Sequence, residues 1–250
     1  MITRVDAESW TRAQAYEKAK AFGVINAGTD WNEWWAAKFN NYELLKGKHF
    51  PNVCEVGCGP HTNVRLLLRG IGWDRAFLED PLIQFYICHP ITDPPGLRRR
   101  LKNAVKRIIH RGTVASVSGT IGLVIENPGK VDLSSCKLES LPYPDGCMDL
   151  LMCVNVLDHV NDCDECIGQI HRVLKPGGVL VLGQDLTNDE DLRSCEECRL
   201  DIGHPIKIDH AYIGRSLQPY SAIFGRVLDR EEGRTPAAHY GTYLGILRKN

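Results

Sequence analysis

The sequence has almost no net charge and no long hydrophobic run. It contains 30 lysine and arginine residues against 31 aspartate and glutamate residues, which gives a formal charge of −1 at pH 7. A charge so close to zero offers no global electrostatic reason to bind nucleic acid or a membrane surface. No apolar stretch reaches the roughly 18 residues that a membrane-spanning helix needs. We therefore expect neither a transmembrane segment nor a nucleic-acid partner.

The beginning of the sequence, MITRVDAESW, lacks the apolar core of a secretory signal peptide. A cytoplasmic location is then the default expectation. In that compartment the ten cysteines are reduced thiols rather than disulfides.

Two Cys-x-x-Cys pairs, Cys163/Cys166 and Cys195/Cys198, have the local spacing of zinc ligands. The pairs are further apart along the chain than in a typical zinc ribbon, and Cys166 falls in step with the positions that a helix would bury. We therefore predict buried thiols and no metal site, with zinc binding by these pairs as the alternative.

The length of 250 residues and the hydrophobic content of 43% fit one α/β domain with additions. We expect an N-terminal helical cap over residues 1–47 and a core over 48–185 with an insertion at 91–125. An acceptor-side segment with a closing hairpin would follow over 186–250.

The pattern along the chain predicts individual elements. A helix is expected over residues 7–22 with a break at 23–28, and a second helix through residue 45. Later strands are expected at 130–133, 149–155 and 179–182, with a final pair at 222–228 and 239–247. The helix before the fifth strand should end at Lys175-Pro176-Gly177-Gly178.

The chain is organised around residues 52–68, which read as a strand, a glycine turn and the start of a helix. Gly57 and Gly59 let the backbone turn tightly and let a ligand approach main-chain N–H groups. The third glycine of the dinucleotide-binding motif would fall at Asn63, so a dinucleotide is disfavoured.

Two acids, Glu79 and Asp80, end the next predicted strand. They lie about 20 residues after the glycine turn, where an acid grips a ribose through its hydroxyls. Asp80 is the preferred residue, and Glu79 is the alternative. A ribose site without a pyrophosphate site indicates a nucleoside ligand, of which S-adenosylmethionine is a common example.

Three motifs then resemble one family. EVGCGP at residues 55–60, LPYPDGCMDLLMCVNVLDHV at 141–160 and HRVLKPGGVLVL at 171–182 are similar, in order and spacing, to the motifs of class I S-adenosylmethionine-dependent methyltransferases. The resemblance implies a Rossmann-like α/β fold with about seven mostly parallel strands and a closing antiparallel hairpin. It also implies methyltransferase activity with S-adenosyl-L-methionine as cofactor.

The resemblance extends to the residues that bind the cofactor. Glu55 would contact the methionyl ammonium, directly or through water, and the backbone at 138–140 would hold adenine, although Lys137 stands near where the family often has an acid. The full set expected to bind the cofactor is Glu55, Gly57, Cys58, Gly59, Asp80, Pro81, Glu139, Ser140 and Asn155.

Methyl transfer from a sulfonium is a direct displacement, so the protein must mainly align the nucleophile and exclude water. A base is needed only if the acceptor must lose a proton. His159, just beyond the fourth strand, is the strongest candidate base, followed by His204 and His210; Tyr240 is weaker. A purely structural role for each histidine is the alternative.

Two helical patterns have open interpretations. The stripe Trp31, Trp34, Trp35, Phe39 and Tyr42 either packs on the domain or forms a lid over the cofactor cleft. Residues 97–111 carry seven arginines and lysines and no acid. That face is solvated, binds an anionic group of the acceptor, or rests on an acidic membrane surface.

The sequence therefore predicts a methyltransferase that acts on an oxygen or nitrogen of a small-molecule or glycan-type acceptor, including a phosphorylated or lipid-linked one. No base-flipping motif and no separate nucleic-acid-binding domain is recognisable. The alternatives are a non-catalytic nucleoside-binding protein on the same fold, or a methyltransferase of protein or nucleic acid. The oligomeric state does not follow from the sequence.

Overall fold

The structure is a computed structural model of the 250-residue chain, and it describes residues 1–27, 31–88, 119–194, 202–233 and 239–250. The predicted basic segment 97–111 lies outside the described residues, as do Cys195 and Cys198 and most of the predicted insertion. The predictions made for these parts remain predictions.

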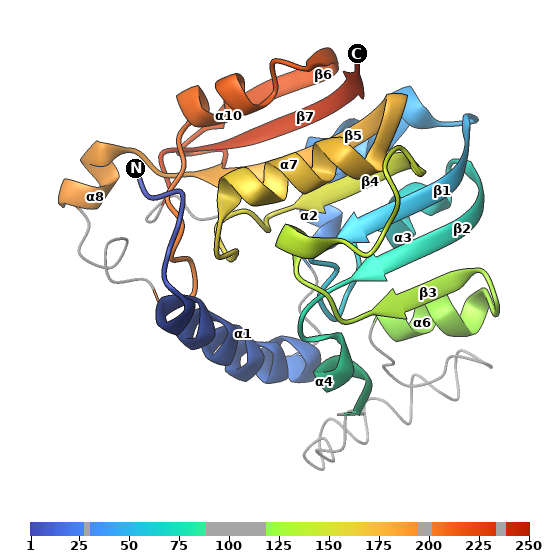
Figure 1. The fold of residues 1–250 in the computed structure, drawn as a ribbon, viewed down its shortest axis with the longest axis horizontal. Helices are drawn as coiled ribbons and strands as arrows, with labels where there is room; N and C mark the ends of the chain where they lie inside the picture. Colours follow the sequence, from blue (N-terminus) through green and yellow to red (C-terminus); the bar gives the residue numbers. More distant parts are fainter. Residues whose placement is uncertain (28–30, 89–118, 195–201, 234–238) are drawn as a thin grey trace.

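Within the described residues, seven strands form one sheet in the order β3-β2-β1-β4-β5-β7-β6 (Figure 1). Strands β1 to β5 pair in parallel, and β7 pairs antiparallel with both β5 and β6. This confirms the predicted α/β fold and its closing hairpin. The strands are β1 (His49–Val56), β2 (Gly72–Glu79), β3 (Val131–Ser134), β4 (Met148–Val154), β5 (Leu174–Leu186), β6 (Tyr220–Asp229) and β7 (Gly241–Lys249).

Both faces of the sheet are covered. Successive side chains of a strand point to opposite faces, so Leu150 and Met152 of β4 belong to one apolar cluster and Leu151 and Cys153 to the other. The first face packs against α2 (Asn32–Lys38), α3 (Val64–Leu68) and α6 (Gly119–Glu126). The second packs against α7 (Cys163–Val173) and α10 (His210–Ser216). Two short helices, α4 (Ile83–Cys88) and α8 (Asp189–Ser194), follow β2 and β5.

Helix α1 (Ala7–Ala27) lies beside α4 near the carboxyl ends of β1 and β2 (Figure 1). The predicted break at residue 23 is wrong, because the helix continues to Ala27. One glycine inside a helix costs about 1 kcal/mol, which this 21-residue helix tolerates. The chain before α1 is held by bridges from Ile2 to Lys207 and from Arg4 to Asp162.

The predicted second helix is instead two pieces, α2 and the 3-10 helix η1 (Asn40–Leu45). Asn40, Asn41 and Tyr42 adopt φ values of 52°, 50° and 57°, which interrupt the helix. Trp35, Phe39 and Tyr42 are buried in the first apolar cluster. A side chain on Gly183 of β5 would meet the Trp35 ring at 2.8 Å, so this glycine makes room for it. Four members of the aromatic stripe therefore pack on the domain, Trp34 only partly buried, while Trp31 is exposed.

The end of α7 also differs from the prediction. Asp162 caps the helix, its carboxylate accepting from the N–H groups of Asp164 and Glu165. The helix ends at Val173, and β5 already begins at Leu174, ahead of the Pro-Gly-Gly turn. Pairing of Leu174 with Met148 of β4 takes precedence over a longer helix.

Two further findings concern cysteines and membranes. Cys163 and Cys166 are fully buried in the second apolar cluster, as predicted for core thiols. Among the described residues, no helix is both long and apolar enough to cross a membrane.

Candidate active site

A cleft opens at the carboxyl ends of β1, β2 and β4, with an empty volume of about 940 Å³ including its mouth. Ligands of open α/β sheets bind at this edge. Four segments after strands line the cleft, and α1 covers it. The lining includes Trp10, Gln14, Glu17, Gly57, Gly59, Asp80, Pro81, Lys137, Glu139, Asn155 and His159.

The glycine turn after β1 depends on left-handed backbone at two positions. Gly57 and Gly59 have φ values of 63° and 57°. A Cβ on Gly57 would lie 2.4 Å from Cγ2 of Val156, whereas a Cβ on Gly59 would meet nothing within 4 Å. Gly57 is needed for packing against the turn after β4, and Gly59 leaves its backbone open to the cleft. Cys58 between them is buried in the core and does not line the cleft.

Glu55 has a different environment from the one the sequence suggested. Its carboxylate is buried and accepts hydrogen bonds from the Thr62 hydroxyl and from the N–H groups of Asn63 at 2.8 Å and Val64 at 3.1 Å. Burial raises the pKa of Glu55 to about 7. The carboxylate therefore fixes the glycine turn to the start of α3 and does not line the cleft. The expected direct contact of Glu55 with a ligand is not supported.

Asp80 lies in the cleft at the tip of β2. Its Oδ2 accepts from the N–H of Gly59 at 2.9 Å, and its Oδ1 accepts from the N–H of Leu82 at 2.7 Å. Burial, with a smaller effect from the Glu17 carboxylate on α1, raises the pKa of Asp80 to about 6. Each oxygen keeps a further lone pair for a ligand hydroxyl.

Glu79, the alternative ribose ligand, already accepts hydrogen bonds from other side chains at both carboxylate oxygens. Its two oxygens accept hydrogen bonds from the Tyr143 hydroxyl and from the Cys136 thiol, the latter at 2.8 Å. Both partners lie on the segment between β3 and β4, which Glu79 thereby ties to β2. Asp80 therefore remains the preferred candidate for a ribose ligand, ahead of Glu79.

The segment before β4 forms the wall where adenine was expected. Leu138 and Glu139 line the cleft, and Ser140 does not. Oε1 of Glu139 accepts from the N–H groups of Asn161 at 2.6 Å and Asp162 at 3.2 Å, so this carboxylate holds the start of α7. Further along the wall, Asn155 lines the cleft with a φ of 57° and donates its N–H to Gly183 at 2.7 Å.

Lys137 joins this wall to α1. Its ammonium lies 3.6 Å from the centroid of the Trp10 ring, a cation–π contact across the cleft. A lysine at this position therefore fastens the cap, whereas an acid could not make the contact.

Two of the three predicted histidines come together. The rings of His159 and His204 have centroids 4.4 Å apart. His210 lies elsewhere: it is exposed at the start of α10, and its N–H donates to the Tyr240 hydroxyl at 2.9 Å. The three histidines therefore do not share one site. Neither His210 nor Tyr240 lines the cleft.

His159 is held from several sides. Its Nδ1 lies 2.8 Å from the carbonyl oxygen of Gly203, its Nε2 lies 3.6 Å from Oδ1 of Asp158, and Gln14 of α1 donates to its carbonyl at 3.3 Å. Burial lowers the pKa of His159, which favours the neutral ring. Burial alone would raise the pKa of Asp158, but His159 and His204 hold it below its usual range.

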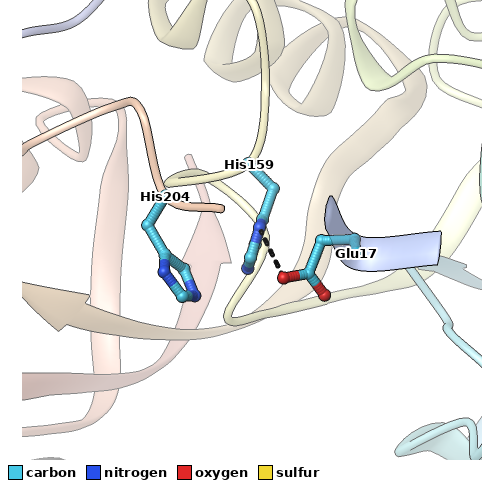
Figure 2. A group of neighbouring side chains, drawn as sticks. All are labelled: Glu17, His159 and His204. Carbon is cyan, nitrogen blue, oxygen red and sulfur yellow. Dashed lines mark ion pairs between the residues drawn. The ribbon is translucent and has the colours of Figure 1, made fainter. Parts of the chain in front are cut away.

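Sequence reasoning missed three residues here. Glu17 of α1 brings a carboxylate oxygen to 4.0 Å from Nδ1 of His159 (Figure 2). Asp158 is buried beside His159, and His239 is buried with its ring centroid 6.4 Å from that of His204. Trp10, Gln14 and Glu17 follow a helical i, i+4, i+7 spacing, a pattern that could have marked one face of α1 as the cleft wall.

Comparison with known proteins agrees with this geometry. A family profile described as "Methyltransferase domain" matches residues 114–182. The ubiquinone/menaquinone biosynthesis C-methyltransferase UbiE of Pseudoalteromonas translucida is 37% identical over 62 residues, which cover 25% of this chain and 23% of the relative. The match thus spans less than a quarter of that relative's length.

Two solved structures match nearly the whole chain. The 1,6-didemethyltoxoflavin-N1-methyltransferase of Burkholderia thailandensis, solved with S-adenosylhomocysteine, superposes with a TM-score of 0.57 at 12% identity, covering 100% of this chain and 95% of that chain. The cyclase SpnF superposes with a TM-score of 0.58 at 16% identity, covering 100% and 97%. At such identities the likeness concerns the fold alone.

The sheet order and the glycine-turn cleft define a Rossmann-like domain built to take a nucleoside-type ligand at the ends of its parallel strands. The three sequence motifs and the methyltransferase-domain match over residues 114–182 agree with this fold, and the chain resembles the class I S-adenosylmethionine-dependent methyltransferases.

Proposed function

We propose that this protein binds S-adenosylmethionine and transfers its methyl group to a small-molecule acceptor. The observation that carries the proposal is the hydrogen bond between Gly59 and Asp80 inside the cleft. It joins the open backbone of the glycine turn to the acid that we propose binds ribose, and both residues line the same cleft.

The cleft residues fit the parts of this cofactor. Asp80 would accept hydrogen bonds from the ribose hydroxyls, Leu138 and the backbone beside it would face adenine, and Gly59 with Asn155 would face the methionyl part. When bound, the cofactor supplies an electrophilic methyl group on a sulfonium. The chain's own task is to bind, orient and keep the site dry.

His159 is the residue we propose to meet the acceptor. If Nδ1 donates its proton to the Gly203 carbonyl, Nε2 carries the lone pair and can accept the proton of an acceptor hydroxyl or amine. Burial lowers the pKa of His159, so the ring is available in its neutral form near pH 7. Helix α1 covers this end of the cleft and excludes water.

The acceptor we propose is small or glycan-type, with an oxygen or nitrogen as the methylated atom. A helix lies over the cleft, and its Lys137–Trp10 and Gln14–His159 contacts hold it there. This arrangement favours an acceptor small enough to be enclosed. The C-methyltransferase named UbiE matches only a short segment, so its acceptor is not carried over.

The alternative is other chemistry on the same fold, as the name of the cyclase SpnF illustrates. A screen separates the two. The reduced protein is incubated with a metabolite extract and methyl-labelled S-adenosylmethionine, and products are identified by mass. A labelled small-molecule product that disappears in Asp80→Ala supports the proposal. Tight cofactor binding without label transfer to any extract fraction would favour the alternative.

A further inference from the structure

Three side chains from distant parts of the sequence converge beside the cleft (Figure 2), and two of them, Glu17 and His159, line it. Glu17 comes from α1, His159 from the turn after β4, and His204 from the segment between α8 and α10. One nitrogen or carboxylate oxygen from each lies within 4.8 Å of the others. We refer to these residues as the Glu17–His159–His204 cluster.

The ring of His159 is oriented as the rings of metal-bound histidines are. Its Nδ1 is 2.8 Å from the Gly203 carbonyl oxygen, which fixes the proton on Nδ1 and leaves the lone pair on Nε2. A carbonyl that accepts from the far nitrogen of a ligating histidine is the usual second partner at metal sites.

A buried carboxylate faces that lone pair. Asp158 is 3% exposed, and its Oδ1 lies 3.6 Å from Nε2 of His159. Neither oxygen accepts a hydrogen bond of ordinary geometry from the described residues, although Gln184 is near enough to favour the charged form. A lone pair facing a buried carboxylate at this distance is repulsive unless a cation lies between or beside them.

The charge around the cluster also favours a cation. Two carboxylates, Glu17 and Asp158, lie beside imidazole rings, and the described cation beside them is Lys20, 3.5 Å from Oε1 of Glu17. One lysine offsets one carboxylate and leaves the other. A divalent ion would more than offset the negative charge that remains.

We infer that Glu17, His159 and His204 bind one divalent transition-metal ion of the zinc type at the acceptor end of the cleft. Two histidines and one carboxylate form a donor set that holds such ions and leaves a position open for water or substrate. Ligands about 2.1 Å from a tetrahedral ion lie about 3.4 Å apart, so ligand atoms now within 4.8 Å of one another approach by at most about 1.4 Å on binding. Side-chain rotation of Glu17 supplies that movement.

This inference rests on the proposed function for its consequence, because the open position faces the space proposed for the acceptor. A hydroxyl of the acceptor would bind there, and the ion would lower its pKa so that its proton leaves to water. The lone pair of His159 is then committed to the ion. Nε2 of His159 can act either as a base or as a metal ligand, but not as both at once. Measuring the metal content of the active protein decides which role it has.

The test uses the full-length protein freed of metal with a chelator and kept reduced. Zn²⁺ is titrated by calorimetry, and Co²⁺ is used as an optical probe. We expect one ion per chain at this site, with a Co²⁺ spectrum of nitrogen and oxygen ligands. His204→Ala should lower the affinity for Zn²⁺ at least about 100-fold, and Glu17→Gln should also weaken it. His210→Ala is the matched control and should bind as the wild type does.

The outcomes separate this inference from the proposed function. Equal Zn²⁺ affinity in the wild type and in His204→Ala overturns it, and so does a Co²⁺ spectrum dominated by thiolate charge transfer. The same metal-free samples are titrated with S-adenosylmethionine. If the protein binds S-adenosylmethionine but not Zn²⁺, only the metal-site inference is overturned. If the protein binds Zn²⁺ in a way that depends on His204 but does not bind S-adenosylmethionine, the metal-site inference stands and the proposed function is overturned.

Discussion

The N–H of Gly59 donates a 2.9 Å hydrogen bond to Oδ2 of Asp80. Asp80 thus holds the turn after β1 in place while its own remaining lone pairs face the cleft. The same carboxylate accepts from the N–H of Leu82 at the start of α4. One side chain therefore positions three segments of the ligand site, and its loss should be felt as a loss of cofactor affinity.

Asp80→Ala should weaken binding of S-adenosylmethionine by about 1.5–3 kcal/mol, because a charge-assisted hydrogen bond to ribose is lost. Calorimetry measures this directly, and thermal unfolding of the variant checks that it is folded. If the affinity is unchanged while Glu79→Ala reduces it, Glu79 is the ribose ligand.

Cofactor affinity should also depend on pH through Asp80. Burial raises the pKa of Asp80 to about 6, so the carboxylate takes up a proton as the pH falls below that value. The protonated form loses its charge-assisted hydrogen bonds to ribose. Affinity should fall by at most about tenfold per pH unit below pH 6, since one proton is involved. Asp80→Asn should bind S-adenosylmethionine weakly, with an affinity that depends little on pH between 5 and 7. If its affinity changes with pH as steeply as that of the wild type, a group other than Asp80 causes the pH dependence.

The two glycines of the turn should respond differently to alanine. Both have positive φ, so each alanine costs on the order of 1–2 kcal/mol of folding free energy. Gly57→Ala also places a Cβ 2.4 Å from Val156 and should destabilise the protein further. Gly59→Ala has open space and should fold, yet bind cofactor poorly because its Cβ enters the cleft. Urea unfolding and calorimetry together measure both effects, and equal stability of the two variants would contradict the account.

Glu55 should make stability fall as the pH rises. Burial raises its pKa from 4.5 to about 7 in the folded protein, so the folded state binds this proton more tightly than the unfolded chain does. The unfolding free energy should therefore decrease between about pH 4.5 and 7, by at most about 1.4 kcal/mol per pH unit from this group. Urea titrations of wild type and Glu55→Gln isolate the effect. The difference in unfolding free energy between wild type and Glu55→Gln should narrow or reverse toward high pH. A difference that stays constant with pH would argue against a raised pKa of Glu55.

His159→Ala should lower turnover about 10²–10⁴-fold with the acceptor found in the screen, because the group that meets the acceptor proton is removed. Its cofactor affinity should stay near that of the wild type. His210→Ala serves as the control, since His210 is exposed and outside the cleft. Wild-type turnover in His159→Ala would remove the residue from the chemistry.

The features predicted well from sequence are local ones. The strand, glycine turn and helix around Gly57 and Gly59 are encoded within a few residues, and so is the acid at the tip of β2. The sheet followed from the order of these units, because parallel strands joined by helices have few stable arrangements.

The features predicted poorly depend on contacts between distant segments. Glu55 was expected to face the ligand, but the N–H groups that begin α3 are nearer and take both of its oxygens. The sequence left open whether the aromatic stripe packs on the domain or covers the cleft; in the structure Trp35 packs on β5, and α1 covers the cleft. Nothing local in the sequence places Glu17 beside His159, since only the docking of α1 brings them together.

The most direct test is a calorimetric titration of the reduced, folded protein with S-adenosylmethionine, with NAD as a comparison ligand. The account predicts one S-adenosylmethionine per chain, competition by S-adenosylhomocysteine, and no binding of NAD, because Asn63 stands where a dinucleotide site needs a third glycine. A folded protein that binds no S-adenosylmethionine, or that binds NAD in its place, would contradict the central claim.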